Sequence, residues 1–251
     1  MINQFEEAFK LNPVAKRCKQ CDKPFNAPHS KVTLCSEACK AEVCNEVNEQ
    51  IAKDRFLHCQ SEFPRVHKGA NIVDFHISGL NGRKELMLAI AGENPVNAVE
   101  VAQKYVFGDI WGLFLSSPQS GIGKTRLGLV VLAEMARKGV RPSASLVGNG
   151  YFKAIDIAKI MESERFDTKK KLTSALSYSD ILMIDELGFE NDKQSQEISA
   201  LIQEREENQL RTIITTNLDY RMIMEKYGQK MLSRIEGVLY SCTGENWRMR
   251  G

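Results

Sequence analysis

The chain has 251 residues and a mass of 28.3 kDa, which is enough for two domains with a buried core. Apolar residues make up 43% and charged residues 26% of the sequence, which excludes the collagen-like, disordered and membrane-protein classes. The 34 Lys and Arg residues nearly balance the 32 Asp and Glu residues, so the net charge of +2 gives no overall attraction to nucleic acid. Any nucleic-acid binding must therefore come from a local patch.

The predicted elements begin with two polar stretches. Residues 1–60 are rich in cysteine and form a predicted docking domain, which ends in a helix over 37–56. Residues 61–97 contain several Gly and Pro residues and are predicted to be a linker that leads into a second domain. The helix offers five candidate buried positions, which are Ala41, Val43, Val47, Ile51 and Phe56.

Residues 98–251 form the predicted second domain, in which helices alternate with short apolar strands. The predicted helices cover 98–106, 124–137, 154–162, 169–178, 194–208 and 220–237. The predicted strands cover 111–116, 143–147, 181–184, 212–216 and 238–242. This alternation is typical of an α/β fold with a parallel sheet that helices cover on both faces.

The cysteine usage points to a reducing compartment. The seven cysteines are odd in number and crowd toward the N-terminus, unlike the even pattern of a secreted disulfide scaffold. The first ten residues are polar and carry Glu6 and Glu7 where a signal peptide would be basic and then apolar. No run reaches the roughly 18 apolar residues of a membrane span. We expect a cytoplasmic protein with no membrane partner.

Four of the cysteines have the spacing of a closed tetrahedral zinc site. Cys18 and Cys21 are separated by two residues, and Cys35 and Cys39 follow thirteen residues later with three between them. The first pair is expected on a tight turn. The second pair is expected at the start of a helix near Ser36. The unpaired backbone N–H groups of a first helical turn favour the thiolate form of cysteine. Four thiolates leave no open position, which favours a structural ion over a catalytic one.

The surrounding text, CKQCDKPFNAPHSKVTLCSEACK, resembles treble-clef zinc fingers. A segment of this length has too little core to fold alone, so bound zinc would contribute the folding free energy. His29 or Cys44 remains an alternative for one of the four ligands. The other alternative is a set of buried cysteines without a metal.

The predicted strand 111–116 runs into the text PQSGIGKT, and a predicted helix follows. This is a phosphate-binding loop with Pro118 where the first Gly is usual, and proline can begin such a turn. Gly121 and Gly123 would turn backbone amides toward phosphate oxygens, Lys124 would reach the β- and γ-phosphates, and Thr125 would ligate Mg²⁺. The alternative is a Gly-rich turn before a helix. The predicted ATP-binding residues are Ser120, Gly121, Ile122, Gly123, Lys124, Thr125 and Arg126.

Two acids end the predicted strand 181–184, in the text ILMIDE. Ligands of open α/β sheets bind at the carboxyl ends of the strands, where these two acids stand. Asp185 is therefore predicted to hold Mg²⁺ through its water shell, and Glu186 is predicted to polarise the attacking water. An Asp-Glu cap after a buried strand is the alternative. Asn217 ends the next strand, where its amide could orient the same water, and a simple Thr-Asn-Leu turn is the alternative.

Four segments together, PQSGIGKT, ILMIDELG, TIITTNL and KMLSRIEG, resemble the AAA+ ATPases of the DnaC/DnaI replicative helicase loader type, which are relatives of the IstB transposition helpers. The resemblance covers about residues 70–251. It implies an AAA+ P-loop core with a five-stranded parallel sheet, ATP with Mg²⁺, ATP hydrolysis and self-assembly into rings or spirals. It also implies a bacterial cell or a phage-infected host.

The same resemblance assigns roles to three further residues. Asn217 becomes the sensor-1 residue. Arg234 becomes an arginine finger that reaches the γ-phosphate bound by a neighbouring subunit. Arg248 is the candidate for a sensor-2-like contact. An ordinary surface arginine is the alternative for both arginines.

Helicase loaders are expected to hold single-stranded DNA inside the ring by stacking and phosphate contacts. Tyr151, Phe152 and Lys153 form an aromatic and basic cluster just after the second predicted strand, and we expect them to touch DNA. Residues 169–171 form the only lysine triplet. A core position for Phe152 and a solvated helix face for the triplet are the alternatives.

Three functions are consistent with these patterns. The favoured one is an ATP-dependent loader, whose N-terminal domain grips a hexameric replicative helicase while the ATPase domain engages single-stranded DNA. The second is an IstB-type helper ATPase that binds duplex DNA and directs a transposase. The third is a nucleotide-gated adaptor with negligible turnover. The separate zinc module favours the loader, because it suits protein docking.

Overall fold

The computed structural model describes residues 14–27, 34, 36–68, 86–90, 92–108, 110–140, 150–162 and 166–246. The chain divides into two compact units, Met1–Lys53 and Asp54–Gly251, each of which is described by itself. Three predicted site residues, Cys35, His29 and Arg248, lie outside the described residues, as does the predicted strand 143–147. No helix in the described ranges is long and apolar enough to cross a lipid bilayer.

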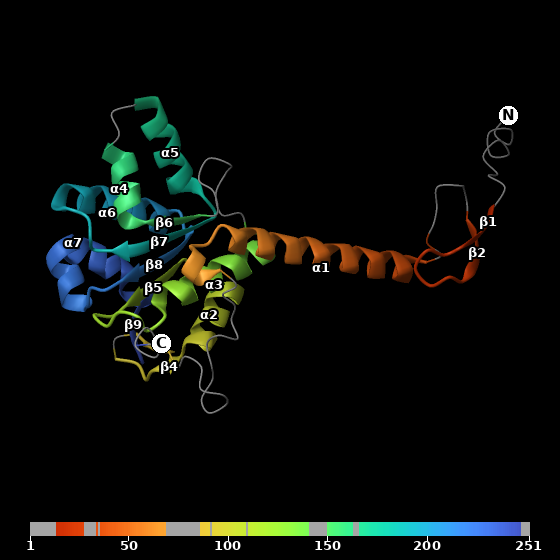
Figure 1. Cartoon of the computed structure of the whole chain (residues 1–251), viewed down its shortest axis with the longest axis horizontal. Helices are drawn as coiled ribbons and strands as arrows, with labels where there is room; N and C mark the ends of the chain where they lie inside the picture. The colour runs from red at the N-terminus through yellow and green to blue at the C-terminus, as the bar shows by residue number, and fades with distance from the viewer. Residues whose placement is uncertain are drawn as a thin grey trace, which may run out of the picture. The chain divides into compact units, whose positions relative to one another are not determined.

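The first unit contains a hairpin followed by a helix (Figure 1). Strand β1 (Val14–Arg17) pairs with β2 (Pro24–Ala27) in antiparallel register. Between them the Cys18 N–H donates to the Lys23 carbonyl at 2.9 Å, which closes the tight turn. Helix α1 (Glu37–Ser61) follows, and the Ser36 hydroxyl caps it by accepting the Cys39 N–H at 3.2 Å. The division between the two units falls within α1.

Three of the five positions predicted to be buried on α1 are exposed. Ala41 is exposed, Val47 is 51% exposed and Ile51 is 42% exposed, so the prediction for these three side chains was wrong. Among the described residues of the first unit, no second apolar layer covers this part of the helix. Only Phe56, beyond the division, packs against a hydrophobic core, next to Cys59 and Phe63 of the second unit.

The second unit is built on a seven-stranded sheet in the order β4-β3-β9-β5-β8-β7-β6. Strands β9, β5, β8, β7 and β6 run parallel, and β3 and β4 join the edge beside β9 in antiparallel register. The strands are β3 (Leu86–Ala89), β4 (Val96–Asn97), β5 (Gly112–Ser116), β6 (Tyr151–Lys153), β7 (Ile181–Leu187), β8 (Arg211–Thr216) and β9 (Leu239–Gly244).

The predicted five-stranded parallel core is therefore present, and β3 and β4 are two further strands that were not predicted from the sequence. Both missed strands are short and lie close to Gly92 and Pro95, in a stretch whose composition suggested a linker. Strand β6 also differs from expectation. The residues Tyr151–Lys153, expected to follow a strand, form the strand itself.

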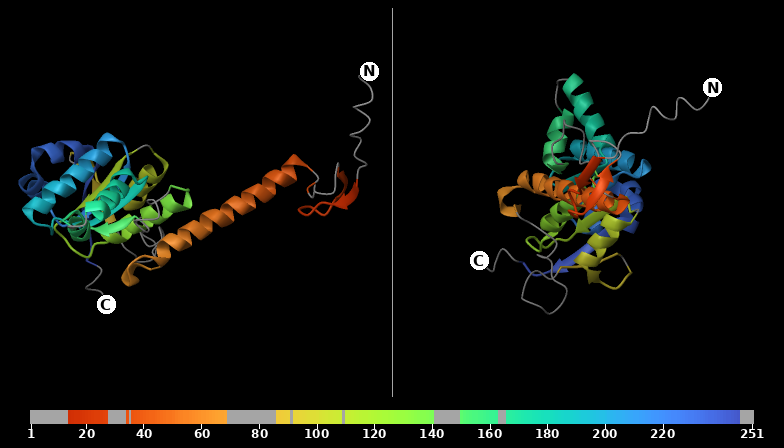
Figure 2. Two further views of the ribbon diagram at one scale, coloured as in Figure 1. Left: turned by 90° about the horizontal axis from the view of Figure 1, so that it is seen from above. Right: turned by 90° about the vertical axis from the view of Figure 1, so that its right-hand side faces the viewer.

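Helices cover both faces of this sheet (Figure 2). Alternate residues of β5 pack on opposite sides, with Leu113 and Leu115 toward α2 and α3, and Phe114 toward α4, α6 and α7. Each helix predicted for residues 98–251 is present within a few residues of its expected bounds. They are α2 (Ala98–Phe107), α3 (Lys124–Arg137), α4 (Ala154–Glu162), α5 (Phe166–Tyr178), α6 (Asp192–Glu207) and α7 (Tyr220–Ile235), with the short 3-10 helices η2 (Arg65–His67) and η4 (Glu236–Val238).

Side chains at the helix starts explain where several of these helices begin. Asn97 accepts the Val99 N–H at the start of α2, and Asp219 accepts the Met222 N–H at the start of α7. Asn191 and Gln194 form a reciprocal capping box at the start of α6. Asn97 is the last residue of β4, and Asn191 and Asp219 lie in the short loops after β7 and β8, so these caps help to fix the passage from strand to helix.

Arg205 on α6 is fully buried and holds three elements together. Its guanidinium donates to the Leu176 carbonyl at 2.6 Å and to the Arg211 carbonyl at 2.7 Å. It also donates to the Thr212 hydroxyl at 3.0 Å. The end of α5 and the start of β8 thus both depend on one arginine. Burial lowers the pKa of Arg205 to about 10.

Candidate nucleotide site and cysteine cluster

The loop between β5 and α3 has the backbone that a phosphate-binding loop requires. Gly121 has φ +76° and Gly123 has φ +113°, both in the left-handed region that glycine enters without steric cost. Helix α3 begins at Lys124, directly after the second of these glycines. The positive end of a 14-residue helix therefore meets the loop, an arrangement that favours an anion.

Lys124 is held inside this loop. Its side chain is buried, and its ammonium group donates to the Ser117 carbonyl at 3.1 Å and to the Gln119 carbonyl at 2.8 Å. A buried ammonium is costly unless charged or polar groups compensate it. An anionic group bound in the loop would supply that compensation, so the surroundings of Lys124 fit a phosphate ligand.

Asp185 lies at the end of β7 and is only 2% exposed. Its Oδ1 accepts the Thr125 hydroxyl at 2.9 Å and also accepts the Thr215 hydroxyl. Its Oδ2 accepts the Tyr151 hydroxyl at 2.9 Å. Burial, and to a smaller extent the charge of Asp185, raises the pKa of Tyr151, which keeps the phenol a proton donor. A carboxylate beside the Thr125 hydroxyl is the oxygen-donor set that suits Mg²⁺.

The close approach of α3 to β7 explains how Thr125 reaches Asp185. Gly128 follows Thr125 by three residues and faces Met183 of β7. A Cβ at Gly128 would lie 2.6 Å from the Met183 methyl carbon and 3.2 Å from Ile213 Cγ2, so a larger residue would require the Met183 side chain to move. The absence of a side chain at Gly128 is consistent with the close packing of α3 on β7 beside the Thr125–Asp185 hydrogen bond.

Glu186, the next residue, has a left-handed backbone with φ +58°, which is uncommon for a non-glycine residue. Its N–H donates to the Thr215 hydroxyl at 3.2 Å. Its carboxylate forms an ion pair with Lys153 of β6, with a distance of 2.7 Å between Nζ and Oε2. The hydrogen bond that the Lys153 ammonium donates to the Glu186 carboxylate is the main reason why the pKa of Lys153 is raised.

Lys124, Thr125 and Glu186 line a pocket of about 560 Å³ at the carboxyl ends of β7 and β8. Glu186 and Asn217, the two residues predicted to act on one water, both line it, and their action on water stays a prediction. Val66 and His67 of η2 also line it, although no motif in the predicted linker distinguished them. The full lining is Val66, His67, Ser120, Gly121, Gly123, Lys124, Thr125, Arg126, Glu186, Thr215, Thr216 and Asn217.

No protein-family model matches the sequence, and no curated protein matches it. Solved structures do match. The crystal structure of the DnaC helicase loader is 24% identical, with a TM-score of 0.51 over 71% of this chain and 98% of that chain. The crystal structure of DnaI is 20% identical, with a TM-score of 0.53 over 75% of this chain and 98% of that chain.

The replication initiator DnaA, solved with AMPPCP and single-stranded DNA, is 17% identical, with a TM-score of 0.51 over 70% of this chain. The match covers 50% of the DnaA chain. The chain has the fold of an AAA+ P-loop NTPase. The predicted resemblance to DnaC and DnaI is thus confirmed at the level of the fold.

Within the AAA+ unit, the other predicted ATP-site residues lie in different surroundings. Ile122, between the two loop glycines, is fully buried and belongs to the hydrophobic core. Arg234 does not line the pocket. It lies on α7, where it forms ion pairs with Glu206 and with Glu207, the latter at 3.1 Å. Within this one chain the predicted arginine finger is therefore held by acids at the end of α6.

Two of the three residues predicted to touch DNA lie beside Asp185 and Glu186. Tyr151 and Lys153 are bonded to Asp185 and Glu186, as described above. Phe152 packs against the hydrophobic cluster on the other side of the sheet. This position agrees with the core alternative for Phe152. Contact of these residues with DNA stays a prediction.

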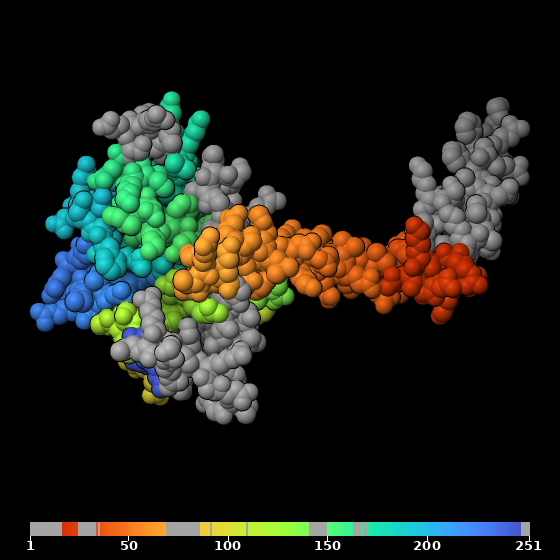
Figure 3. Space-filling view, viewed as in Figure 1, coloured from red at the N-terminus to blue at the C-terminus, as the bar shows by residue number. Residues whose placement is uncertain are grey.

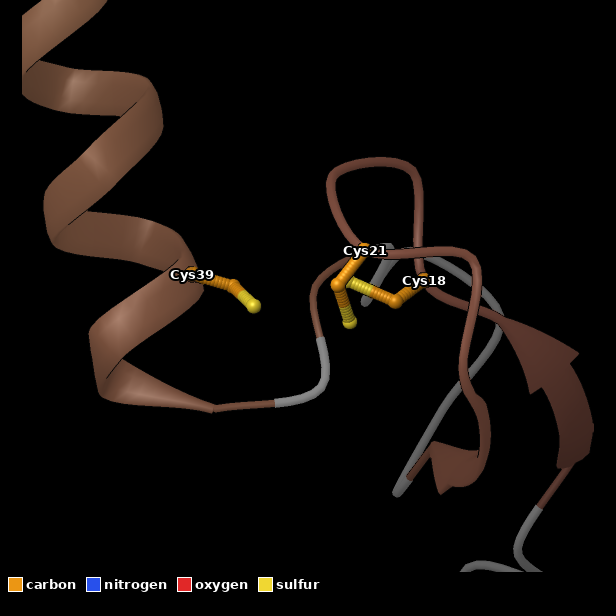
Figure 4. A group of neighbouring side chains, drawn as sticks. All are labelled: Cys18, Cys21 and Cys39. Carbon is orange, nitrogen blue, oxygen red and sulfur yellow. The ribbon is translucent and has the colours of Figure 1, made fainter.

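In the first unit, three of the predicted zinc ligands come together. The Sγ atoms of Cys18, Cys21 and Cys39 lie within 4.8 Å of one another, and the side chains converge from the hairpin turn and from the first turn of α1 (Figure 4). Two thiolates of a tetrahedral zinc site are roughly 3.8 Å apart, given a Zn–S distance of about 2.3 Å. The cluster therefore fits zinc. Among the described cysteines it does not include Cys44, which is exposed on α1.

Proposed function

We propose that the protein is an ATP-dependent loader of a hexameric replicative DNA helicase, acting on single-stranded DNA. One observation carries the proposal, namely an AAA+ unit that matches 98% of the DnaC helicase loader chain and of DnaI. The cysteine cluster of the N-terminal unit supports a separate zinc module, which is suited to gripping the helicase. We propose 1–60 as the docking domain, 61–97 as the linker and entry to the ATPase domain, whose sheet includes β3 and β4, and 98–251 as the ATPase core.

The geometry of the pocket supports ATP hydrolysis. The loop amides and Lys124 would bind the phosphates, and Thr125 and Asp185 would hold Mg²⁺, which offsets the negative charge of the phosphates. Glu186 lines the pocket and would accept a proton from water, and Asn217 would orient that water. Nucleotide-bound DnaA has the same fold, which supports ATP as the ligand.

Self-assembly would complete the site. Arg234 is proposed to reach the γ-phosphate bound by a neighbouring subunit of a ring or spiral, for which it must leave Glu206 and Glu207. Arg248 is retained as the proposed sensor-2-like residue. DnaA of the same fold has been solved with single-stranded DNA, which supports a single strand as the nucleic-acid partner.

Capture of the cognate hexameric helicase tests the docking part of the proposal. The full-length protein should retain the helicase on an affinity resin, and a Cys39→Ser variant should lose it because the zinc module no longer folds. The matched Cys44→Ser variant should behave as the wild type. Equal capture by all three proteins would contradict docking through the N-terminal unit. Capture of a transposase instead, with ATP-dependent binding to duplex DNA, would favour the IstB-type alternative.

Hydrolysis tests the enzymatic part. The wild type should hydrolyse ATP slowly, and Glu186→Gln should hydrolyse it at least about tenfold more slowly while still binding nucleotide. Lys124→Ala should lose nucleotide binding. A wild type that binds ATP but hydrolyses it no faster than Glu186→Gln would instead favour a nucleotide-gated adaptor.

A further inference from the structure

Helix α7 is interrupted in its middle, at Gly228. This residue has φ +81° and ψ 166°, which are not helical values. The combination belongs to a backbone region that is essentially open to glycine alone. Helix α7 therefore consists of two segments, residues 220–227 and residues 229–235, and the conformation of Gly228 sets the direction of the second segment relative to the first. The helix lies at the surface of the second unit (Figure 3, blue).

A lack of space does not explain the glycine. Among the residues that the structure describes, no heavy atom would lie within 4 Å of a Cβ at Gly228. The backbone conformation therefore selects glycine at this position. A conformation that other residues avoid persists only where the surrounding structure holds it in place, and such positions cluster at functional sites.

The first segment is fixed at its end, directly before the break. The Tyr227 hydroxyl donates a hydrogen bond to the carboxylate of Glu190, which is only 2% exposed. The Lys226 ammonium donates to the Glu190 carbonyl at 2.7 Å. Glu190 in turn accepts the Gly188 N–H at 3.0 Å, in the loop that follows β7. The break therefore starts from a tyrosine that a buried acid holds in place.

The second segment carries Arg234 and is fixed by different contacts. Met231, Leu232 and Ile235 are buried in the hydrophobic cluster on the α4, α6 and α7 side of the sheet. Arg234 has a side chain that is 26% exposed. It follows the break at Gly228 within the same short segment, so a change in the direction of this segment would displace the guanidinium.

We propose that Gly228 and Tyr227 are positioning residues for Arg234. The break at Gly228 sets the direction in which the second segment presents Arg234 to the nucleotide of a neighbouring subunit, and the bond from Tyr227 holds the break. The inference rests on the arginine-finger role proposed above. Neither Gly228 nor Tyr227 lines the nucleotide pocket of its own chain, so changing them should alter catalysis and leave nucleotide binding intact.

Steady-state hydrolysis and nucleotide binding by the full-length protein test the break. In Gly228→Ala the second segment must take another direction, and a misplacement of about 1 Å can cost about 100-fold in rate. We expect the kcat of Gly228→Ala to fall at least about tenfold, with the Kd for ATP within about twofold of the wild type. Tyr227→Phe should lower kcat about two- to fivefold, because it removes one hydrogen bond that holds the break.

Gly92→Ala is the matched control. Gly92, in the loop between β3 and β4, has φ +85°, and a Cβ there would likewise meet no described atom within 4 Å. This variant strains the backbone away from α7 and should hydrolyse ATP as the wild type does. An unchanged kcat in Gly228→Ala, or an equal loss in Gly92→Ala, would overturn the proposal. If circular dichroism shows that Gly228→Ala does not fold, an unchanged kcat in Tyr227→Phe overturns it instead.

Mixed subunits separate positioning toward a neighbour from a general loss of stability. Lys124→Ala offers an intact α7 but binds no nucleotide, and Arg234→Ala binds nucleotide but offers no finger. Their equimolar mixture should hydrolyse ATP faster than either variant alone. Adding Gly228→Ala to the Lys124→Ala subunit should reduce this gain about tenfold, whereas adding Gly92→Ala should leave it unchanged. A gain that Gly228→Ala does not reduce would contradict the inference.

Arg234→Ala by itself distinguishes a failure of the proposed function from a failure of the positioning. If Arg234→Ala hydrolyses ATP as fast as the wild type, the arginine-finger role is wrong and the positioning is wrong with it. If Arg234→Ala is slow and the mixture shows no gain, Arg234 acts within its own chain, which contradicts presentation to a neighbour. If the mixture shows the gain and Gly228→Ala keeps the wild-type rate, the proposed function stands and only the positioning fails.

Discussion

Thr125 and Asp185 are 60 residues apart in the sequence, and the hydroxyl of the first donates a 2.9 Å hydrogen bond to the carboxylate of the second. The bond joins the first turn of α3 to the end of β7, the two elements that carry the predicted Mg²⁺ ligands. Hydroxyl groups from β6 and β8 bond the same carboxylate. Asp185 is therefore positioned by three different elements.

The Tyr151 hydroxyl should matter for Mg²⁺. Tyr151→Phe removes one of the donors that orient Asp185, and removing such an outer partner typically weakens metal binding by about tenfold or more. We expect half-maximal ATP hydrolysis to need about tenfold more Mg²⁺, with little change at saturating Mg²⁺. The exposed Tyr178→Phe is the control. An unchanged Mg²⁺ dependence of Tyr151→Phe would argue against this role.

Arg205 should be required for stability. Arg205→Met leaves buried carbonyl groups at the end of α5 and the start of β8 without their donor, and we expect the free energy of unfolding to fall by about 3 kcal/mol. Arg221→Met removes an exposed ion pair with Glu225 and should change it by less than about 1 kcal/mol. Urea unfolding followed by circular dichroism measures both. Equal midpoints would refute the structural role of Arg205.

Zinc content tests the cysteine cluster. The purified wild type should contain about one zinc ion per chain by elemental mass spectrometry, as expected for a single structural site. Cys39→Ser should lose the ion and Cys44→Ser should keep it. Loss of zinc from both variants would make Cys44 a ligand. A wild type that stays free of zinc after reconstitution would contradict the metal site.

The two cysteines of the second unit, Cys59 and Cys242, should be chemically inert. Burial raises the pKa of Cys59 to about 12 and that of Cys242 to about 12, so almost no thiolate is present at pH 8. Iodoacetamide at pH 8 should therefore leave both unmodified in the folded protein and modify both in urea. The exposed Cys44 should react under both conditions. Peptide mass spectrometry reports the sites, and native modification of Cys59 as fast as that of Cys44 would count against its burial.

The elements around the phosphate loop were predictable because their signals are local. The loop glycines, Lys124 and the acids after β7 each stand directly next to a continuous apolar strand or a helix start, and such patterns need no knowledge of distant contacts. The parallel core followed from alternating helices and strands, together with the resemblance to the helicase loaders.

Features set by pairing between distant residues were not predictable in the same way. Strands β3 and β4 are too short to show a periodic pattern. Val66 lines the pocket only because the fold brings it close to the phosphate-binding loop, which is distant from it in the sequence. The pair between Lys153 and Glu186 joins residues 33 positions apart, and a lysine after two aromatic residues suggested nucleic acid instead. Exposure of Val47 also could not be read from apolar spacing alone, since spacing does not say whether a covering layer exists.

The function proposed for this protein is to place a replicative helicase on single-stranded DNA at the expense of ATP. The direct measurement is the amount of cognate hexameric helicase bound to circular single-stranded DNA, with ATP and Mg²⁺, as a function of added full-length protein. Wild-type protein should give a clear increase over helicase alone, and Lys124→Ala should give little increase. No increase with wild-type protein that is folded, zinc-loaded and bound to ATP would contradict it.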